Sequence, residues 1–126
     1  LRPADKVHVY EGLSLVDGVP IAVFRPVFPA TRFPDLLEHL TQTSSVTAAL
    51  KAHGLPDYTR ASTEVTAKRA SATVATHLQI AAGDPILRTV SVNVDPEGAP
   101  VEYGRTWFAG DRVAFTVDGG GGRGST

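Results

Sequence analysis

The pair Asp17-Gly18, which separates two runs of alternating apolar residues, is the feature that most constrains the fold of this chain. An Asp-Gly pair adopts positive φ angles at little cost and closes a two-residue turn between antiparallel strands. The pattern therefore predicts a hairpin with strands over 7–16 and 19–28. Several prolines in the second run lack an N–H group, which predicts that this strand lies partly at a sheet edge or bends there.

Two short helices and a long extended segment are predicted after the hairpin. Apolar residues at positions 33, 36, 37 and 40 form one stripe at helical spacing. Ser44 or Ser45 is placed to cap a second helix, which ends at Gly54. Alternating side chains over 58–69 indicate a strand, and Ser71 is placed to cap a third helix.

Three more strands are predicted in the last third of the chain. They span 86–95, 100–108 and 112–117, with turns rich in Gly, Pro and Asp between them. The element order is ββ-αα-β-α-βββ, which predicts an α+β fold with an antiparallel or mixed sheet flanked by short helices. Strict βα alternation and a Gly-rich strand-to-helix turn are both missing, so a dinucleotide-binding fold is excluded.

The length of 126 residues suits one domain, which we expect over 6–118. Residues 1–5 read as a linker remnant and 119–126 as a flexible Gly-rich tail. Because the chain opens on Leu1, we expect it to be part of a longer protein. No apolar run long enough to span a membrane and no signal peptide is found, so we expect a cytoplasmic protein with no membrane partner.

Few residues are arranged for catalysis or for metal binding. The histidines lack HxH, HxxxH and HExxH spacing, and the chain has no cysteine, so we expect no metal site. No GxSxG nucleophile motif occurs, and Gly119–Gly122 lacks the Lys-Ser/Thr of a phosphate loop. We therefore expect no catalytic residue and no cofactor. The net charge of −1 argues against a free-standing nucleic-acid binder.

Glu102 and several arginines lie inside predicted strands, where charged side chains are unusual. Glu102 either faces solvent or lines a pocket between the sheet and the helices. Arg60, Arg88 and Arg105 either form cross-strand salt bridges, for instance with Glu64 or Glu102, or meet a small anion as a basic cluster. Both interpretations stay open at this point.

Hydroxyl side chains add neutral donors to this picture. Ser45 and Thr47 lie at the start of the second predicted helix, where backbone N–H groups also favour an anion. The residues alone thus indicate a pocket for a small anionic ligand.

Eight short phrases, taken in order and spacing, resemble one family of regulatory domains. They are VDGVPI (16–21), FPA (28–30), RFP (32–34), VTAAL (46–50), DYTR (57–60), VNVD (92–95), VEYG (101–104) and FAGDRV (108–113). Together they resemble UTRA domains, the effector-binding domains of GntR-superfamily, HutC-type transcription regulators. The resemblance is strongest to the branch named for regulators of phosphonate utilisation, and it covers most of the predicted domain.

The resemblance implies a chorismate-lyase-like α+β fold and a homodimeric protein. It implies an N-terminal winged helix-turn-helix outside this sequence, so that DNA is contacted only through that missing domain. A small anionic metabolite, which is phosphorylated, phosphonate-like or a carboxylate, is the implied effector, and its binding is expected to change DNA binding by allosteric coupling.

One departure from the family pattern limits which ligand is expected. Sugar-phosphate-sensing relatives carry basic residues and a Glu at the positions near Gly12, Ser14 and Phe24, so a sugar phosphate is not expected here. The candidate effector-contacting residues are Ser14, Ser45, Thr47, Arg60, Arg88, Ser91, Glu102, Tyr103 and Arg105.

Two alternative functions are compatible with parts of the sequence. A chorismate-lyase-like enzyme could use Glu102 with Arg60 or Arg88 to hold an aryl substrate, although the VNVD and FAGDRV phrases resemble the regulators. A degenerate module that only dimerises is compatible with the missing basic residues at positions 12 and 14. We expect a non-enzymatic sensor.

Overall fold

A computed structural model describes residues 6–43, 45–55 and 57–117. The predicted linker (1–5), the predicted tail (119–126), Ser44 and Asp118 lie outside the described residues. The elements are β1 (Val7–Val9), β2 (Gly12–Val16), β3 (Val19–Pro29), α1 (Leu36–Thr43), α2 (Val46–Ala52), β4 (Thr59–Arg69), α3 (Ala72–Leu78), β5 (Pro85–Val94) and β6 (Pro100–Ala109).

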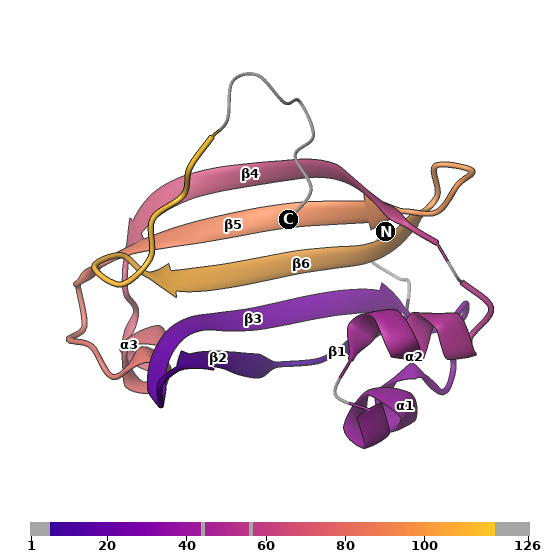
Figure 1. Cartoon of the computed structure of the whole chain (residues 1–126), viewed down its shortest axis with the longest axis horizontal. Coiled ribbons are helices and arrows are strands. Elements are labelled where there is room, and N and C mark those ends of the chain that lie inside the picture. Colours follow the sequence, from indigo (N-terminus) through magenta and orange to yellow (C-terminus); the bar gives the residue numbers. More distant parts are fainter. Residues whose placement is uncertain (1–5, 44, 56, 118–126) are drawn as a thin grey trace.

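Six strands in the described part of the chain form one antiparallel sheet, as predicted for the α+β class. The strand order is β1-β3-β6-β5-β4, and β2 also pairs with β3 (Figure 1). The hairpin turn is formed by Asp17 and Gly18, both with positive φ angles of 50° and 77°. The hairpin predicted from this pair is therefore confirmed.

The predicted first strand, 7–16, is interrupted in the structure. β1 ends at Val9 and β2 begins at Gly12, because Pro26 of β3 stands opposite this break and has no N–H to donate. Pro26 instead accepts a hydrogen bond from Tyr10 N at 3.1 Å. β3 itself lies inside the sheet, between β1–β2 and β6, and not at an edge.

α1 and α2 pack on one sheet face at one end of β3. Phe28 of β3, Leu40 of α1 and Leu50 of α2 are fully buried in one core cluster. Ser45 caps α2 by accepting from Ala48 N at 3.2 Å, and Gly54 ends the helix with a φ of 81°. We call this the α1–α2 face.

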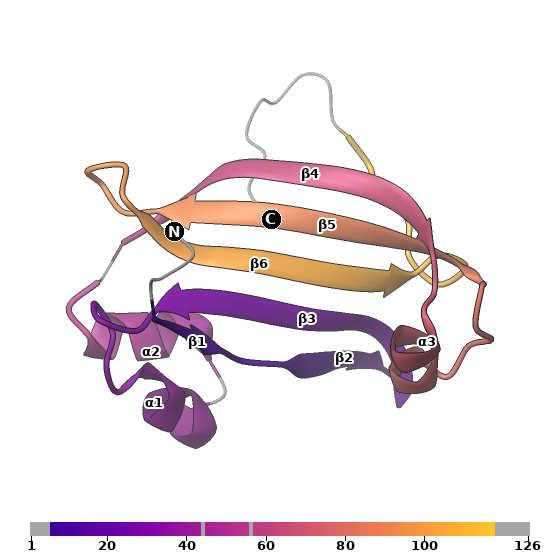
Figure 2. The same ribbon diagram turned by 180° about the vertical axis from the view of Figure 1, so that it is seen from behind.

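α3 packs on the opposite sheet face, at the other end of β3 (Figures 1 and 2). Val23 contributes to its core cluster with Leu78 of α3 and Ile86 of β5. Val23 and Phe28 lie five residues apart on one strand, so their side chains point to opposite faces. The predicted cap Ser71 accepts from Val74 N at 3.2 Å. We call this the α3 face.

The predicted last strand, 112–117, is wrong: within the described residues this segment forms no strand after the turn at Asp111–Arg112. Arg112 instead donates to Pro20 O at 2.8 Å and Leu78 O at 2.7 Å, and more weakly to Gln79 O at 3.3 Å. The charged side chain thus joins the C-terminal end of α3 to the hairpin, and these contacts divert the chain from the sheet.

The turn between β5 and β6 is tied to the segment that precedes α1. Asp95 accepts from Glu97 N and Ala99 N and forms an ion pair with Arg32 at 2.7 Å. These bonds lower the pKa of the Asp95 carboxyl, first through the Ala99 N–H and then through the guanidinium of Arg32. The predicted 95–98 turn is confirmed, with Gly98 at a φ of 85°.

Candidate functional site

Three polar side chains form a hydrogen-bonded chain across β4, β5 and β6 on the α1–α2 face. The strand register places Arg60 opposite Asn93, and Asn93 opposite Glu102. Arg60 Nε donates to Asn93 Oδ1 at 2.8 Å, and Asn93 Nδ2 donates to Glu102 Oε1 at 2.9 Å. The amide of Asn93 therefore links a cation and a carboxylate that are two strands apart.

Burial determines the electrostatics of the Arg60–Asn93–Glu102 hydrogen-bonded chain. Asn93 is only 6% exposed, and desolvation raises the pKa of Glu102 above its ordinary value. The hydrogen bond from Asn93 and the charge of Arg60 oppose that rise. Glu102 is therefore half-buried beside Asn93, and it is held there as a hydrogen-bond acceptor.

Hydroxyl groups border the three-residue chain. Arg60 Nη1 donates to Thr63 Oγ1 at 3.0 Å, and Thr63 is paired with Ser91. A Cβ atom at Gly104 would lie 3.3 Å from Ser91 Oγ and 3.9 Å from Glu102 Oε2. The absence of a side chain at this glycine leaves the Ser91 hydroxyl and the Glu102 carboxylate uncovered on that side.

The two hydroxyl groups predicted at the start of α2 as donors for a ligand are engaged in hydrogen bonds within the protein. The hydroxyl of Ser45 is used in capping α2. Thr47 Oγ1 is 2.9 Å from Tyr58 Oη, in the segment that leads into β4. This contact joins α2 to the strand that carries Arg60.

Phe24 occupies the space over Gly12 on the α1–α2 face. A Cβ atom at Gly12 would lie 2.2 Å from the far end of the Phe24 ring, so the ring covers this glycine. Phe24 also contacts Tyr10 with ring centroids 6.3 Å apart. The candidate Ser14 lies on the neighbouring β2, opposite Ala22, and no hydrogen bond joins it to the Arg60 chain among the described residues.

The remaining candidates lie on the α3 face. The register pairs Tyr103 with Val92 and Val27, and Arg105 with Val90 and Arg25. Arg88 is opposite Trp107 on the same face. The sheet therefore separates the candidate set into two groups, because successive residues of a strand point to opposite sides. Ser91, Glu102 and Arg60 lie together, while Tyr103, Arg88 and Arg105 lie behind them.

Asn93 is the residue that sequence reasoning missed, together with Thr63. A signal was present, since Asn93 is an amide inside the β-branched run of β5, where polar side chains are disfavoured. Its position between Arg60 and Glu102 depends on the register of two strand pairs, which the sequence pattern alone does not specify.

Comparison with known proteins places this fold in a family. Residues 1–114 match the model of the UTRA domain. A curated relative, an uncharacterized HTH-type transcriptional regulator of Rhizobium meliloti, is 45% identical over 84% of this chain and 43% of its own length. The HTH-type transcriptional repressor PhnF of Mycolicibacterium smegmatis is 27% identical over 85% of this chain, again over 43% of its length. The chain thus spans less than half of these curated relatives.

Solved structures agree with that match. A GntR-family transcriptional regulator from Enterococcus faecalis superposes with a TM-score of 0.76 at 28% identity, covering 94% of this chain and 84% of that one. The crystal structure of PhnF from Mycobacterium smegmatis superposes with a TM-score of 0.79 at 27% identity, covering 87% and 48%. The sheet topology, the sequence match and these superpositions lead to one conclusion: the chain belongs to the UTRA domain family.

Proposed function

We propose that this chain senses a small anionic metabolite and controls DNA binding by a helix-turn-helix domain elsewhere in a longer, homodimeric regulator. The names of the curated relatives, which are HTH-type transcriptional regulators of which this chain spans less than half, support this role. The single observation that carries the proposal is the half-buried Arg60–Asn93–Glu102 chain, whose central residue Asn93 is 6% exposed. A protein that needed only a stable sheet would place apolar residues there.

The chemistry of the site suggests the ligand class. Arg60 supplies a positive charge, and the hydroxyls of Thr63 and Ser91 are neutral hydrogen-bonding groups beside it. Glu102 is an acceptor on the far side of Asn93. This set suits a compact metabolite with an anionic group, either phosphate, phosphonate or carboxylate, and at least one hydroxyl or amine donor. The phosphonate-utilisation branch of the family favours the phosphonate within that class.

The proposed role is non-enzymatic and cytoplasmic, in keeping with relatives that are transcription regulators. Incubation of the chain with chorismate tests this directly. We expect no pyruvate above the uncatalysed background. Pyruvate release that depends on Glu102 would replace the sensor with a lyase.

A melting-temperature titration tests effector binding. Phosphate, methylphosphonate, phosphonoacetate and small dicarboxylates are added singly to the chain, and the ligand that stabilises it is titrated. At 100 times its Kd, a ligand that binds only the folded state adds about 2.7 kcal/mol. We expect Arg60→Gln to abolish the shift and Arg88→Gln, on the α3 face, to leave it unchanged. A folded chain that responds to no anion, or responds equally in both variants, would contradict the proposal.

A further inference from the structure

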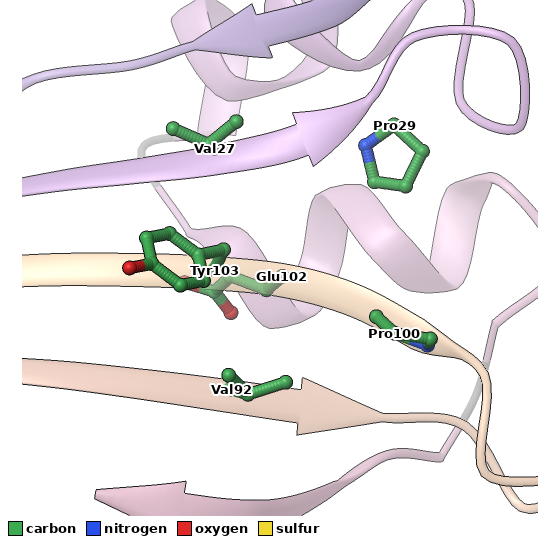
Figure 3. A pocket seen from close by; sticks show the side chains of 6 residues that line it. All are labelled: Val27, Pro29, Val92, Pro100, Glu102 and Tyr103. Carbon is green, nitrogen blue, oxygen red and sulfur yellow. The ribbon is translucent and has the colours of Figure 1, made fainter. Parts of the chain in front are cut away.

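A hollow lies on the α3 face, next to Glu102 of the polar chain described above. It has a volume of about 360 Å³ and is lined by Val27, Pro29, Val92, Pro100, Glu102 and Tyr103. Figure 3 shows the three side chains of the central row, from Val27, Tyr103 and Val92, with the helices behind the strands. Volumes of this size are typical of sites for small molecules, and the lining is largely apolar.

This hollow shares only Glu102 with the Arg60–Asn93–Glu102 chain. Tyr103 follows Glu102 directly on β6, so their side chains leave the sheet on opposite sides. The carboxylate of Glu102 is engaged by Asn93 on the α1–α2 face. Tyr103, which is 41% exposed, can be reached by a ligand from the α3 face without displacing that hydrogen bond.

The next row of side chains along the same face is basic at its centre. Arg105 is two residues beyond Tyr103 and is paired with Arg25 on β3 and Val90 on β5. The acids of this row stand at its ends: Glu11 pairs with Arg25 at 3.6 Å, and Glu64 is opposite Val90 on β4. Neither acid is paired with Arg105, so the centre of this row keeps a positive charge.

Arg105 also carries a polar atom that lacks a partner. Its Nε is buried, and among the described residues it has no hydrogen-bond partner; the same holds for Nε of Arg88 in the following row. A buried N–H group without an acceptor costs free energy, and a carboxylate bound to the guanidinium would supply a charge-assisted acceptor for Arg105.

We propose that the α3 face binds a small amphipathic carboxylate, with its apolar body in the hollow against Tyr103 and its carboxylate on Arg105. The spacing suits a medium-length acyl or aryl group, because two residues of a strand advance by about 7 Å. The apolar row supplies the contact area and Arg105 supplies the charge. The proposed ligand contacts Tyr103 and Arg105 on the α3 face, whereas the proposed effector contacts the polar side chains of the α1–α2 face.

Calorimetric titration with octanoate tests the proposal on the 126-residue chain, with 1-octanol as the uncharged probe. We expect octanoate to bind at least about tenfold more tightly than 1-octanol, and Arg105→Gln to remove that difference, as expected for a lost charge-assisted hydrogen bond. Val92→Asp, which adds a negative charge to the hollow, should abolish binding of octanoate. Far-UV circular dichroism and the melting temperature confirm that each variant is folded.

Two variants serve as matched controls. Arg25→Gln removes a guanidinium from the same row that already has Glu11 as a partner, and should weaken octanoate binding less than Arg105→Gln does. Arg60→Gln, on the α1–α2 face, should leave it unchanged. Equal binding of octanoate and 1-octanol, loss of binding in Arg60→Gln, or self-association that covers the hollow and excludes octanoate would each overturn the proposal.

Discussion

On β5 and β6, the α1–α2 face carries Asn93 and Glu102, whereas the α3 face carries Val92 and Tyr103. In an ordinary sheet with one solvated side, the apolar residues are the more buried set. Here Asn93 is 6% exposed and Tyr103 is 41% exposed. The comparison teaches that burial and polarity are inverted on this strand pair, and both proposed sites depend on that inversion.

The α3 face has a charged contact in addition to its apolar core. On the α3 face, Arg112 binds backbone carbonyls of α3 and the hairpin. On the α1–α2 face, an apolar core that includes Phe28 and Leu50 joins the helices to the sheet. The Arg112 clamp is thus added to an apolar core on the α3 face, and substitutions can test how much it contributes.

The largest effect is expected on the α3 side. Arg112→Ala removes the hydrogen bonds to Pro20 O and Leu78 O and leaves partly buried carbonyls unsatisfied. We expect a loss of about 3 kcal/mol in the free energy of unfolding. Urea denaturation measures it, with Arg69→Ala as the control at an exposed arginine. A loss no larger than that of the control would show that the clamp contributes little.

Asn93→Ala is expected to cost less, about 2 kcal/mol, because it leaves the Glu102 carboxylate without its amide donor. Ser62→Ala, at an exposed position of β4, provides the control. The same variant should lose the response to the effector. If Asn93→Ala is stable and still responds, the polar residues of the α1–α2 face are not the site.

Gly12→Ala should cost about 1 kcal/mol, because the added Cβ requires the Phe24 ring to move. The cost should disappear when Phe24 is replaced by the smaller Leu, since the ring is the atom group that the Cβ meets. A double-mutant cycle measures the coupling. Additive effects of the two substitutions would mean that the ring does not cover Gly12 in solution.

The smallest effects concern pH and have opposite signs for two carboxyls. Burial raises the pKa of Glu102 above its ordinary value of 4.5. Ionisation of this half-buried carboxyl therefore lowers the stability of the fold as pH rises above 4.5 and through the raised pKa. The pKa of Asp95 is lowered from 3.8, chiefly by the Ala99 N–H, so its contribution is lost as pH falls from that value through its lowered pKa.

Melting temperatures of Glu102→Gln and Asp95→Asn across this range measure both contributions. Relative to the wild type, Glu102→Gln should become more stable as pH rises above 4.5. Asp95→Asn should approach the wild type as pH falls below 3.8. If the melting temperature depends on pH in the same way for all three proteins, neither carboxyl has a pKa that is perturbed by the fold.

Much of the fold could be predicted from local chemistry. The Asp17-Gly18 turn, the Ser45 and Ser71 caps and the turn that begins at Asp95 each follow from a short-range rule, and each is confirmed. The segment 112–117 was predicted wrongly, because its alternating pattern carries no sign that Arg112 binds carbonyls of distant elements.

The candidate site was harder to predict than the fold. Arg60 and Glu102 were identified because charged residues are unusual in strands, but the residue that connects them was not. Asn93 meets both only when the register of β4, β5 and β6 is known. The same register places Arg88 and Arg105 on the opposite sheet face from Arg60. Residue type and sequence spacing alone could not reveal that division.

An NMR titration of the chain with the anion that stabilises it tests the central claim most directly, because neighbouring residues of β5 report on opposite faces. If the effector binds the α1–α2 face, the side-chain amide of Asn93 and the backbone amides around Thr63 and Ser91 should shift in proportion to occupancy, while the methyl groups of Val92 and the ring of Tyr103 stay unchanged. Shifts confined to Val92 and Tyr103, with Asn93 unaffected, would contradict the account.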